Sequence, residues 1–307
     1  MRPSQLVSFC VLAVIWGTTW LAIKVVVAEM PPLTAAGLRF GSAALLLALY
    51  AGLRGRRLGW SRIDPADRRL LLILSLLMFS VPYALIFFGE QYIESALTSI
   101  LFSIAPAFTL VFDSWRSRRN LASGGRLVGL LLAFSGILFI FIPRLAGPPA
   151  ELWGSMAVIG AAASSSWAMV LAKHRANHLD TLVSTSWQMG LGSVWLLLAA
   201  LPLERFGWAH HGRPALGGAS VQAWLALFYL AAFGSCICFV LFYGLLKEMA
   251  AVQLSSLAFI TPVVAVFAGW LALNEVLGME VLIGAAVVLL GVALLHRPMP
   301  EPAPAGD

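Results

Sequence analysis

The sequence is dominated by apolar runs of about twenty residues that recur along nearly its whole length. About twenty residues of α-helix rise about 30 Å, the thickness of the hydrocarbon core of a bilayer. A backbone exposed to lipid must satisfy its hydrogen bonds internally, which a helix does. The alternating ten-residue segments of a transmembrane β-barrel are not seen. The runs therefore predict an all-α integral membrane protein whose first partner is the lipid bilayer.

Ten transmembrane helices are predicted between the polar, Pro and Gly breaks in the chain. The first five are expected near 5–27, 33–52, 70–90, 94–115 and 124–142. The second five are expected near 151–173, 180–202, 220–246, 250–273 and 278–296. The remaining segment, 298–307, is rich in Pro and Ala and predicts a disordered cytoplasmic tail.

The basic residues indicate how the helices are oriented. Fifteen of the twenty Lys and Arg residues fall on one side of the predicted spans, which places both termini in the cytoplasm and requires an even number of crossings. The net charge of +6 therefore reflects orientation, and we expect no nucleic-acid partner. The three cysteines, Cys10, Cys236 and Cys238, lie inside apolar runs, so no disulfide framework, metal site or cofactor is indicated.

The two halves of the chain, 1–146 and 147–297, read as copies of one five-helix unit. The matched positions are Lys24 with Lys173, Arg39 with Gln188, Ser99 with Ser255, Pro106 with Pro262, Gly129 with Gly284 and Gly136 with Gly291. Because five is odd, the second copy must enter the membrane upside down, as in many secondary transporters. The four glycines are seven apart in each half and predict close helix contact.

Several segments carry a family resemblance. WGTTWLAIK, PPLTAAGLRF and SSLAFITPVVAVFAGWLALNE, with the later Gly284 and Gly291, resemble the EamA branch of the drug/metabolite transporter superfamily over nearly the whole chain. The resemblance implies an exporter of amino acids or other polar metabolites in a bacterial inner membrane. Its central cavity is lined by the first four helices of each half, and the fifth packs away from it. One departure is that the acidic residue after the fourth helix is Glu275 in the second copy but Arg119 in the first.

Polar and aromatic side chains inside the spans predict the substrate site, because each costs free energy if it faces lipid. The candidate substrate-binding residues are Trp16, Thr19, Arg39, Tyr83, Phe87, Thr98, Ser99, Phe102, Trp167, Trp187, Gln188, Phe239, Tyr243, Ser255, Ser256 and Phe259. Helix packing is the alternative for the Ser and Thr residues, and an interfacial belt is the alternative for Trp16, Trp20, Trp167 and Trp187. Trp16 and Trp187 are favoured for the cavity because both lie well inside their spans.

Charged and proline residues within the spans suggest further roles. Arg39 is a cation about 9 Å below the outer surface, where it needs a substrate carboxylate, a pair with Glu90 or Glu94, or a path by which it snorkels outward. Pro106 and Pro262 predict either paired hinges or static kinks. No carboxylate is predicted near the midplane, which favours facilitated diffusion or loose coupling, with Glu90 as the candidate proton carrier.

These observations predict a secondary transporter that exports small polar or amphipathic metabolites, amino acids foremost, by alternating access. The alternatives are a multidrug or nucleobase exporter of the same fold and, in a different class, a membrane channel. An enzyme is not expected, because the chain has no HExxH, GxSxG or GxxxxGK[ST] motif. The sequence leaves the oligomeric state open.

Overall fold

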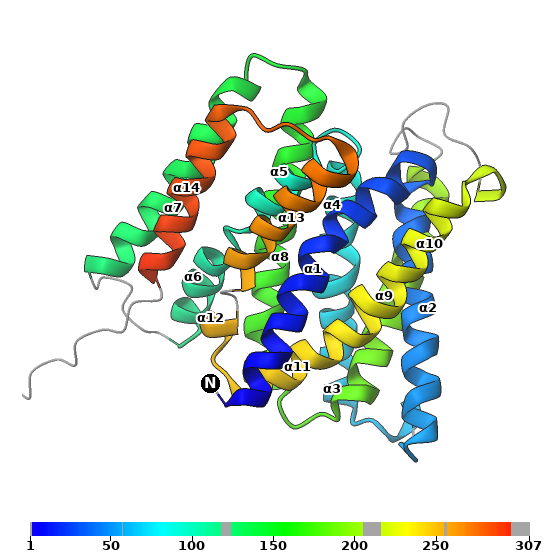
Figure 1. Cartoon of the computed structure of the whole chain (residues 1–307). Coiled ribbons are helices and arrows are strands. Elements are labelled where there is room, and N and C mark those ends of the chain that lie inside the picture. The colour runs from blue at the N-terminus through cyan, green and yellow to red at the C-terminus, as the bar shows by residue number, and fades with distance from the viewer. Residues whose placement is uncertain (1, 57, 118–123, 205–215, 255–256, 296–307) are drawn as a thin grey trace, which may run out of the picture.

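The computed structural model describes residues 2–56, 58–117, 124–204, 216–254 and 257–295, and the regular elements of these ranges are all helical (Figure 1). Eight helical segments within them are long and apolar enough to cross a membrane. Five are single helices: α1 (Pro3–Glu29), α2 (Pro32–Leu53), α7 (Gly124–Arg144), α8 (Pro149–Arg175) and α9 (Thr181–Leu203). The prediction of an all-helical membrane protein is confirmed.

The other long segments are interrupted. One joins α3 (Pro65–Leu74) and α4 (Val81–Gly89) through the π-helical η2 (Ser75–Ser80). A second joins α10 (Val221–Tyr229) and α11 (Cys238–Glu248) through the π-helical η4 (Leu230–Ile237). A third consists of α5 (Ser95–Phe102) and α6 (Ala105–Ser117), and the chain ends in α12 (Ala251–Leu254), α13 (Leu257–Leu273) and α14 (Met279–Leu295). The π-helical segments therefore occur in the third helix of each predicted half, and such segments are frequent at functional sites.

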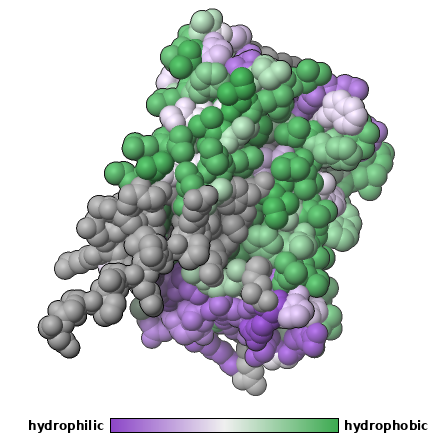
Figure 2. All heavy atoms as spheres, turned by 60° about the vertical axis from the view of Figure 1, so that its left-hand side comes forward, coloured by the Kyte–Doolittle hydropathy of each residue, from purple (hydrophilic) through white to green (hydrophobic). Residues whose placement is uncertain are grey.

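The outer surface suits a lipid environment. Figure 2 shows a broad apolar band, with hydrophilic side chains gathered toward the bottom of the view. Many large apolar side chains are exposed, among them Leu45 on α2, Leu131 on α7 and Val263 on α13. Exposed apolar surface of this extent marks contact with a membrane or partner rather than with water.

Carboxylates from distant helix ends fix where several helices begin. Glu204 accepts hydrogen bonds from the backbone N–H groups of Leu33 and Thr34 at the start of α2. Glu275 likewise accepts from the backbone N–H of Ser95, at 2.9 Å, at the start of α5. The first N–H groups of a helix have no partner within it, and an anion at that end also interacts favourably with the helix dipole. Glu275 therefore acts as a helix cap.

Two helix pairs dominate the packing. The second helix of each predicted half, α2 and α9, pack along each other, and so do the fifth helices, α7 and α14. In Figure 1, α7 and α14 stand together at one side of the molecule. Meanwhile α1 packs on α13, and both α4 and α6 pack on α8. Each half therefore completes its packing against the other half.

Lys24 and Lys173, which the sequence matches with each other, make the same kind of contact. The ammonium of Lys24 donates to the backbone carbonyls of Glu90 and Ile93, at 2.8 and 2.6 Å. The ammonium of Lys173 donates to the carbonyl of Leu246 at 2.5 Å, at the end of α11. Each lysine thus ties the first helix of its half to the end of a third helix, α4 in one case and α11 in the other.

The two candidate hinge prolines differ in their surroundings. Pro106 is the second residue of α6 and follows a turn at Ser103 and Ile104, whereas Pro262 lies inside α13. Pro106 falls in the middle of the apolar span Ser95–Ser117, and this span is interrupted at the turn just before it. A helix has already ended before it, and a proline in the first turn loses no intrahelical hydrogen bond. Ser255, which the sequence matches with Ser99, lies outside the described residues.

The contact between α7 and α14 depends on its glycines. A Cβ atom added to Gly136 would lie 2.7 Å from the backbone nitrogen of Val288. We expect Gly136→Leu to destabilise the protein by about 2 kcal/mol, because the helices must separate to admit the side chain. Thermal unfolding in detergent, followed by tryptophan fluorescence, measures this. Gly52→Leu is the control, because a Cβ at Gly52 meets no atom within 4 Å. Equal melting temperatures for the two variants would contradict the prediction.

Candidate functional site

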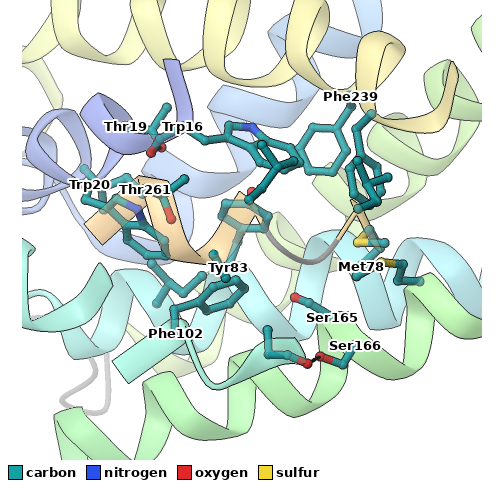
Figure 3. A pocket seen from close by; sticks show the side chains of 18 residues that line it. Trp16, Thr19, Trp20, Met78, Tyr83, Phe102, Ser165, Ser166, Phe239 and Thr261 are labelled. Carbon is teal, nitrogen blue, oxygen red and sulfur yellow. Dashed lines mark hydrogen bonds between the residues drawn. The ribbon is translucent and has the colours of Figure 1, made fainter. Parts of the chain in front are cut away.

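A cavity of about 110 Å³ lies between the two halves of the chain (Figure 3). The first half contributes side chains from α1, η2, α4, α5 and α6, and the second half from α8, α11, α12 and α13. The family resemblance implied that the first four helices of each half line the cavity, and the structure differs for the second helix of each half. No described residue of α2 or α9 lines this cavity, because these helices pack on each other.

Aromatic rings form much of the cavity wall. The ring of Trp16 lies 5.5 Å from that of Phe239 and 5.3 Å from that of Phe242, between centroids. Trp20 and Phe102 form a second pair at 5.3 Å. The Nε1–H of Trp16 donates to a backbone carbonyl of η4, that of Gly234, at 3.1 Å. This bond joins the first helix of the chain to the π-helical segment of the second half.

Hydrogen-bonding groups are few in this wall. Thr19 and Ser166 use their hydroxyls on backbone carbonyls, at 2.7 and 2.9 Å. Ser165 and Thr261 make no hydrogen bond with another described residue, and neither does the buried Nε1–H of Trp20. The described side chains that line the cavity include no charged group. Among the described lining residues, the wall is therefore apolar and aromatic, with two hydroxyls and one buried indole N–H that have no described partner.

Arg39 lies behind this wall. Its side chain is 1% exposed, its Nε donates to Ser235 Oγ at 2.8 Å, and its guanidinium carbon lies 4.6 Å from the centre of the Tyr83 ring. Tyr83 itself lines the cavity, and Nη1 of Arg39 has no partner among the described residues. The structure contains no ion pair of Arg39 with Glu90 or Glu94 within 4.0 Å in the described ranges. Snorkelling is also wrong, because the guanidinium is buried.

The structure brings five of the candidate residues into the cavity wall: Trp16, Thr19, Tyr83, Phe102 and Phe239. Gln188 and Tyr243 line a separate, smaller pocket, where the Tyr243 hydroxyl donates to Gln188 Oε1 at 2.7 Å. Phe87, Thr98 and Ser99 are buried and do not line the cavity. Ser255 and Ser256 lie outside the described residues, as does the side chain of Phe259.

The remaining two candidate tryptophans lie elsewhere. Trp187 donates from Nε1 to the carbonyl of Leu58 at 3.0 Å, and its ring lies 4.7 Å from that of Trp60. Trp167 packs on Phe112, with ring centroids 5.4 Å apart. These rings therefore serve contacts between helices and loops in the described structure.

Trp20, Phe242 and Met78 are among the lining residues that the candidate set left out, and the first two carried a signal in the sequence. Trp20 follows Trp16 by four residues and shares its helix face, and Phe242 follows Phe239 by three. Met78, which also lines the cavity, lies in η2 and carries no such signal. Helical spacing from Trp16 and Phe239 could therefore have added Trp20 and Phe242 to the predicted cavity wall.

Glu90 is a second buried ionisable residue, and its carboxyl group has no described hydrogen-bond partner. The residue is 0% exposed, and neither carboxylate oxygen accepts a hydrogen bond from a described group. The ammonium of Lys24 approaches through the backbone carbonyl of Glu90 instead. Buried polar groups are nearly always paired, so an unpaired buried carboxyl group is a candidate functional residue.

Comparison with known proteins gives consistent matches. The model of the EamA-like transporter family matches residues 4–142 and again residues 152–297. The uncharacterized transporter YoaV of Bacillus subtilis is 28% identical over 279 residues, covering 91% of each chain. The uncharacterized inner membrane transporter YedA of Escherichia coli is 27% identical over 288 residues, covering 92% of this chain and 88% of its own. A solved crystal structure shares the fold, with a TM-score of 0.69, 18% identity, and coverage of 96% of this chain and 98% of the other.

Proposed function

Because the chain belongs to the EamA-like transporter family, we propose that it is a secondary transporter that exports small amphipathic metabolites by alternating access. The observation that carries this proposal is the aromatic cavity formed between the halves, to which equivalent elements of both contribute. A site at the interface of two related halves can open to either side of the membrane as they rock against each other.

The proposed architecture has ten spans in two inverted repeats. Eight crossings are supported by helix length and composition, and the apolar helices α13 and α14 supply the remaining two. The inverted relation is supported by the repeated family match, the two π-helical segments and the equivalent lysine contacts. We place the chain in a bacterial inner membrane with both termini in the cytoplasm, on the side that carries most of the basic residues.

Two substrate classes are candidates. Amino acids with large apolar side chains suit the aromatic wall, and Arg39, whose Nη1 has no described partner, would supply a charge for the substrate carboxylate if Tyr83 turned aside. Uncharged drugs or nucleobases are favoured instead by the lack of charged groups among the described lining residues. A channel remains the competing class, and it would pass ions without saturation.

For energetic coupling we propose Glu90 as the proton carrier. Its burial and its lack of a described hydrogen-bond donor make the charged form costly in this conformation. Lys24 on α1, Arg39 on α2 and Glu275 at the end of α13 are the charged groups that act on it electrostatically. A conformational change that opened this region to water would lower the cost of ionisation, so protonation and conformation would be linked.

Obstruction of the cavity tests the proposed function. We expect Ser165→Trp to reduce counterflow of labelled metabolites in proteoliposomes at least about tenfold, because the indole would occupy space beside the aromatic wall. Ser135→Trp on α7 is the control, because its exposed side chain lies away from the cavity. Unchanged counterflow in the Ser165 variant would show that transport does not pass through this cavity. A non-saturating ion current would favour a channel.

A further inference from the structure

From the chemistry of the cavity wall we infer that the substrate is a flat, uncharged molecule with a hydrogen-bond acceptor, and that this acceptor receives the Nε1–H of Trp20. The inference rests on the proposed function, in which this cavity is the transport site. It favours uncharged ligands over amino acids and assigns to Trp20 the discrimination among uncharged ligands. Three observations support it: the absence of charge, the aromatic walls, and the unpaired indole donor.

The first observation is electrostatic. No described side chain in the wall is charged, and the cation behind it, Arg39, lies against the ring of Tyr83 with 1% of its surface exposed. An ionised group moved from water into such a site costs several kcal/mol unless a counter-charge meets it there. A zwitterion brings two such groups. An uncharged ligand avoids this cost.

The second observation is the shape of the wall. Trp16 and Phe239 lie on one side of the cavity, and Trp20 with Phe102 forms another aromatic pair (Figure 3). The ring of Phe242 also contacts that of Trp16. Aromatic faces and edges contact flat rings over a large area at centroid distances of about 4.5–7 Å. A planar apolar ligand would therefore find partners on more than one side.

The third observation is the indole donor of Trp20. The residue is 7% exposed and its Nε1–H has no described partner, whereas the corresponding donor of Trp16 is bonded to the carbonyl of Gly234. Figure 3 shows Trp20 and Thr261 at the same end of the pocket, with the hydroxyl of Ser165 also directed into it. A buried donor nearly always has an acceptor. The missing acceptor is assigned to the ligand, and the two free hydroxyls can bond its remaining polar atoms.

Binding of three matched ligands to the purified full-length protein tests the inference by titration calorimetry. Phenylacetamide has a ring and an uncharged amide acceptor, L-phenylalanine has the same ring and is a zwitterion, and ethylbenzene has the ring without an acceptor. We expect phenylacetamide to bind at least about tenfold more tightly than L-phenylalanine. Trp20→Phe removes the N–H and keeps an aromatic ring, so it should weaken phenylacetamide about five- to tenfold and ethylbenzene less than about twofold. Trp153→Phe, at an exposed site on α8, should change neither.

The inference is overturned if L-phenylalanine binds as tightly as phenylacetamide, if Trp20→Phe weakens phenylacetamide and ethylbenzene equally, or if phenylacetamide does not bind at all. Counterflow in proteoliposomes separates this failure from that of the proposed function. Saturable counterflow of L-phenylalanine without that of phenylacetamide would refute the substrate class and retain the transporter. Binding of phenylacetamide without any counterflow would support the inferred ligand class and contradict the proposed transport function.

Discussion

Replacement of Arg39 by Ala is expected to abolish export while the protein still inserts into the membrane. The guanidinium joins elements from both halves, since Arg39 contacts Tyr83 on α4 and donates to Ser235 in η4. Loss of a buried cation–π contact and a charged hydrogen bond removes about 3 kcal/mol of interaction, which corresponds to about a 100-fold change in an equilibrium constant. Tyr83 lines the cavity, and η4 accepts the hydrogen bond from Trp16 of the cavity wall, so the loss would fall on the proposed transport site.

The measurement is the initial rate of counterflow in proteoliposomes, with size-exclusion chromatography as the check on folding. Arg54→Ala is a matched control, because Arg54 also lies over a tyrosine ring, that of Tyr50 at 5.3 Å, but both are exposed at the end of α2. The control variant should transport at the wild-type rate. If Arg39→Ala transported normally, neither a substrate contact nor a bridging role for Arg39 would stand.

Replacement of Glu90 by Gln is expected to remove the effect of a proton gradient on export and to leave exchange of substrate intact. Gln keeps the size of the side chain but cannot gain or lose a proton in the physiological range. Because Glu90 is buried without a described hydrogen-bond donor, the neutral amide should fit without loss of stability. With an acidic exterior, the wild-type protein should build up an outward substrate gradient that is up to about tenfold steeper for each pH unit, if one proton enters for each substrate that leaves.

Proteoliposomes with an imposed pH difference provide the assay, and counterflow at equal pH provides the reference rate. The exposed neighbour Glu94 gives the matched control, and Glu94→Gln should respond to the gradient as the wild type does. A gradient response that survives in Glu90→Gln would rule out this carboxyl as the proton carrier. A wild-type protein indifferent to the gradient would indicate facilitated diffusion.

The positions of the helices could be predicted closely from the sequence. The expected span 33–52 is α2, Pro32–Leu53, and the expected span 180–202 is α9, Thr181–Leu203. Proline at the start of α2 and the side chain of Asp180 at the start of α9 are local signals that need no tertiary contact. The interruptions were less visible. Nothing in the residues of η2 marks a π-helical segment, whereas the break at Ser103 and Ile104 lies in the turn before Pro106, where a proline disrupts a helix.

The candidate site could be predicted only in part. Trp16 and Tyr83 were expected in the cavity and line it, but Trp187, favoured equally, contacts Trp60 and Leu58 instead. For Arg39 the sequence left open a substrate carboxylate, a pair with Glu90 or Glu94, or snorkelling, and its guanidinium lies against the ring of Tyr83. In both cases the sequence identified an unusual side chain within a span, but the neighbouring helix determined what that side chain contacts.

The sequence by itself determined that this chain is a duplicated, helical membrane protein, because the bilayer fixes the length of an apolar helix and the absence of water fixes its hydrogen bonding. The tertiary structure alone decided which faces enclose the cavity. Lipid and protein interior are both apolar, so hydrophobic periodicity cannot distinguish the face of a helix that packs from the face that meets lipid. The mutual packing of α2 and α9 kept both helices out of the cavity wall and left α1 to supply Trp16, Thr19 and Trp20.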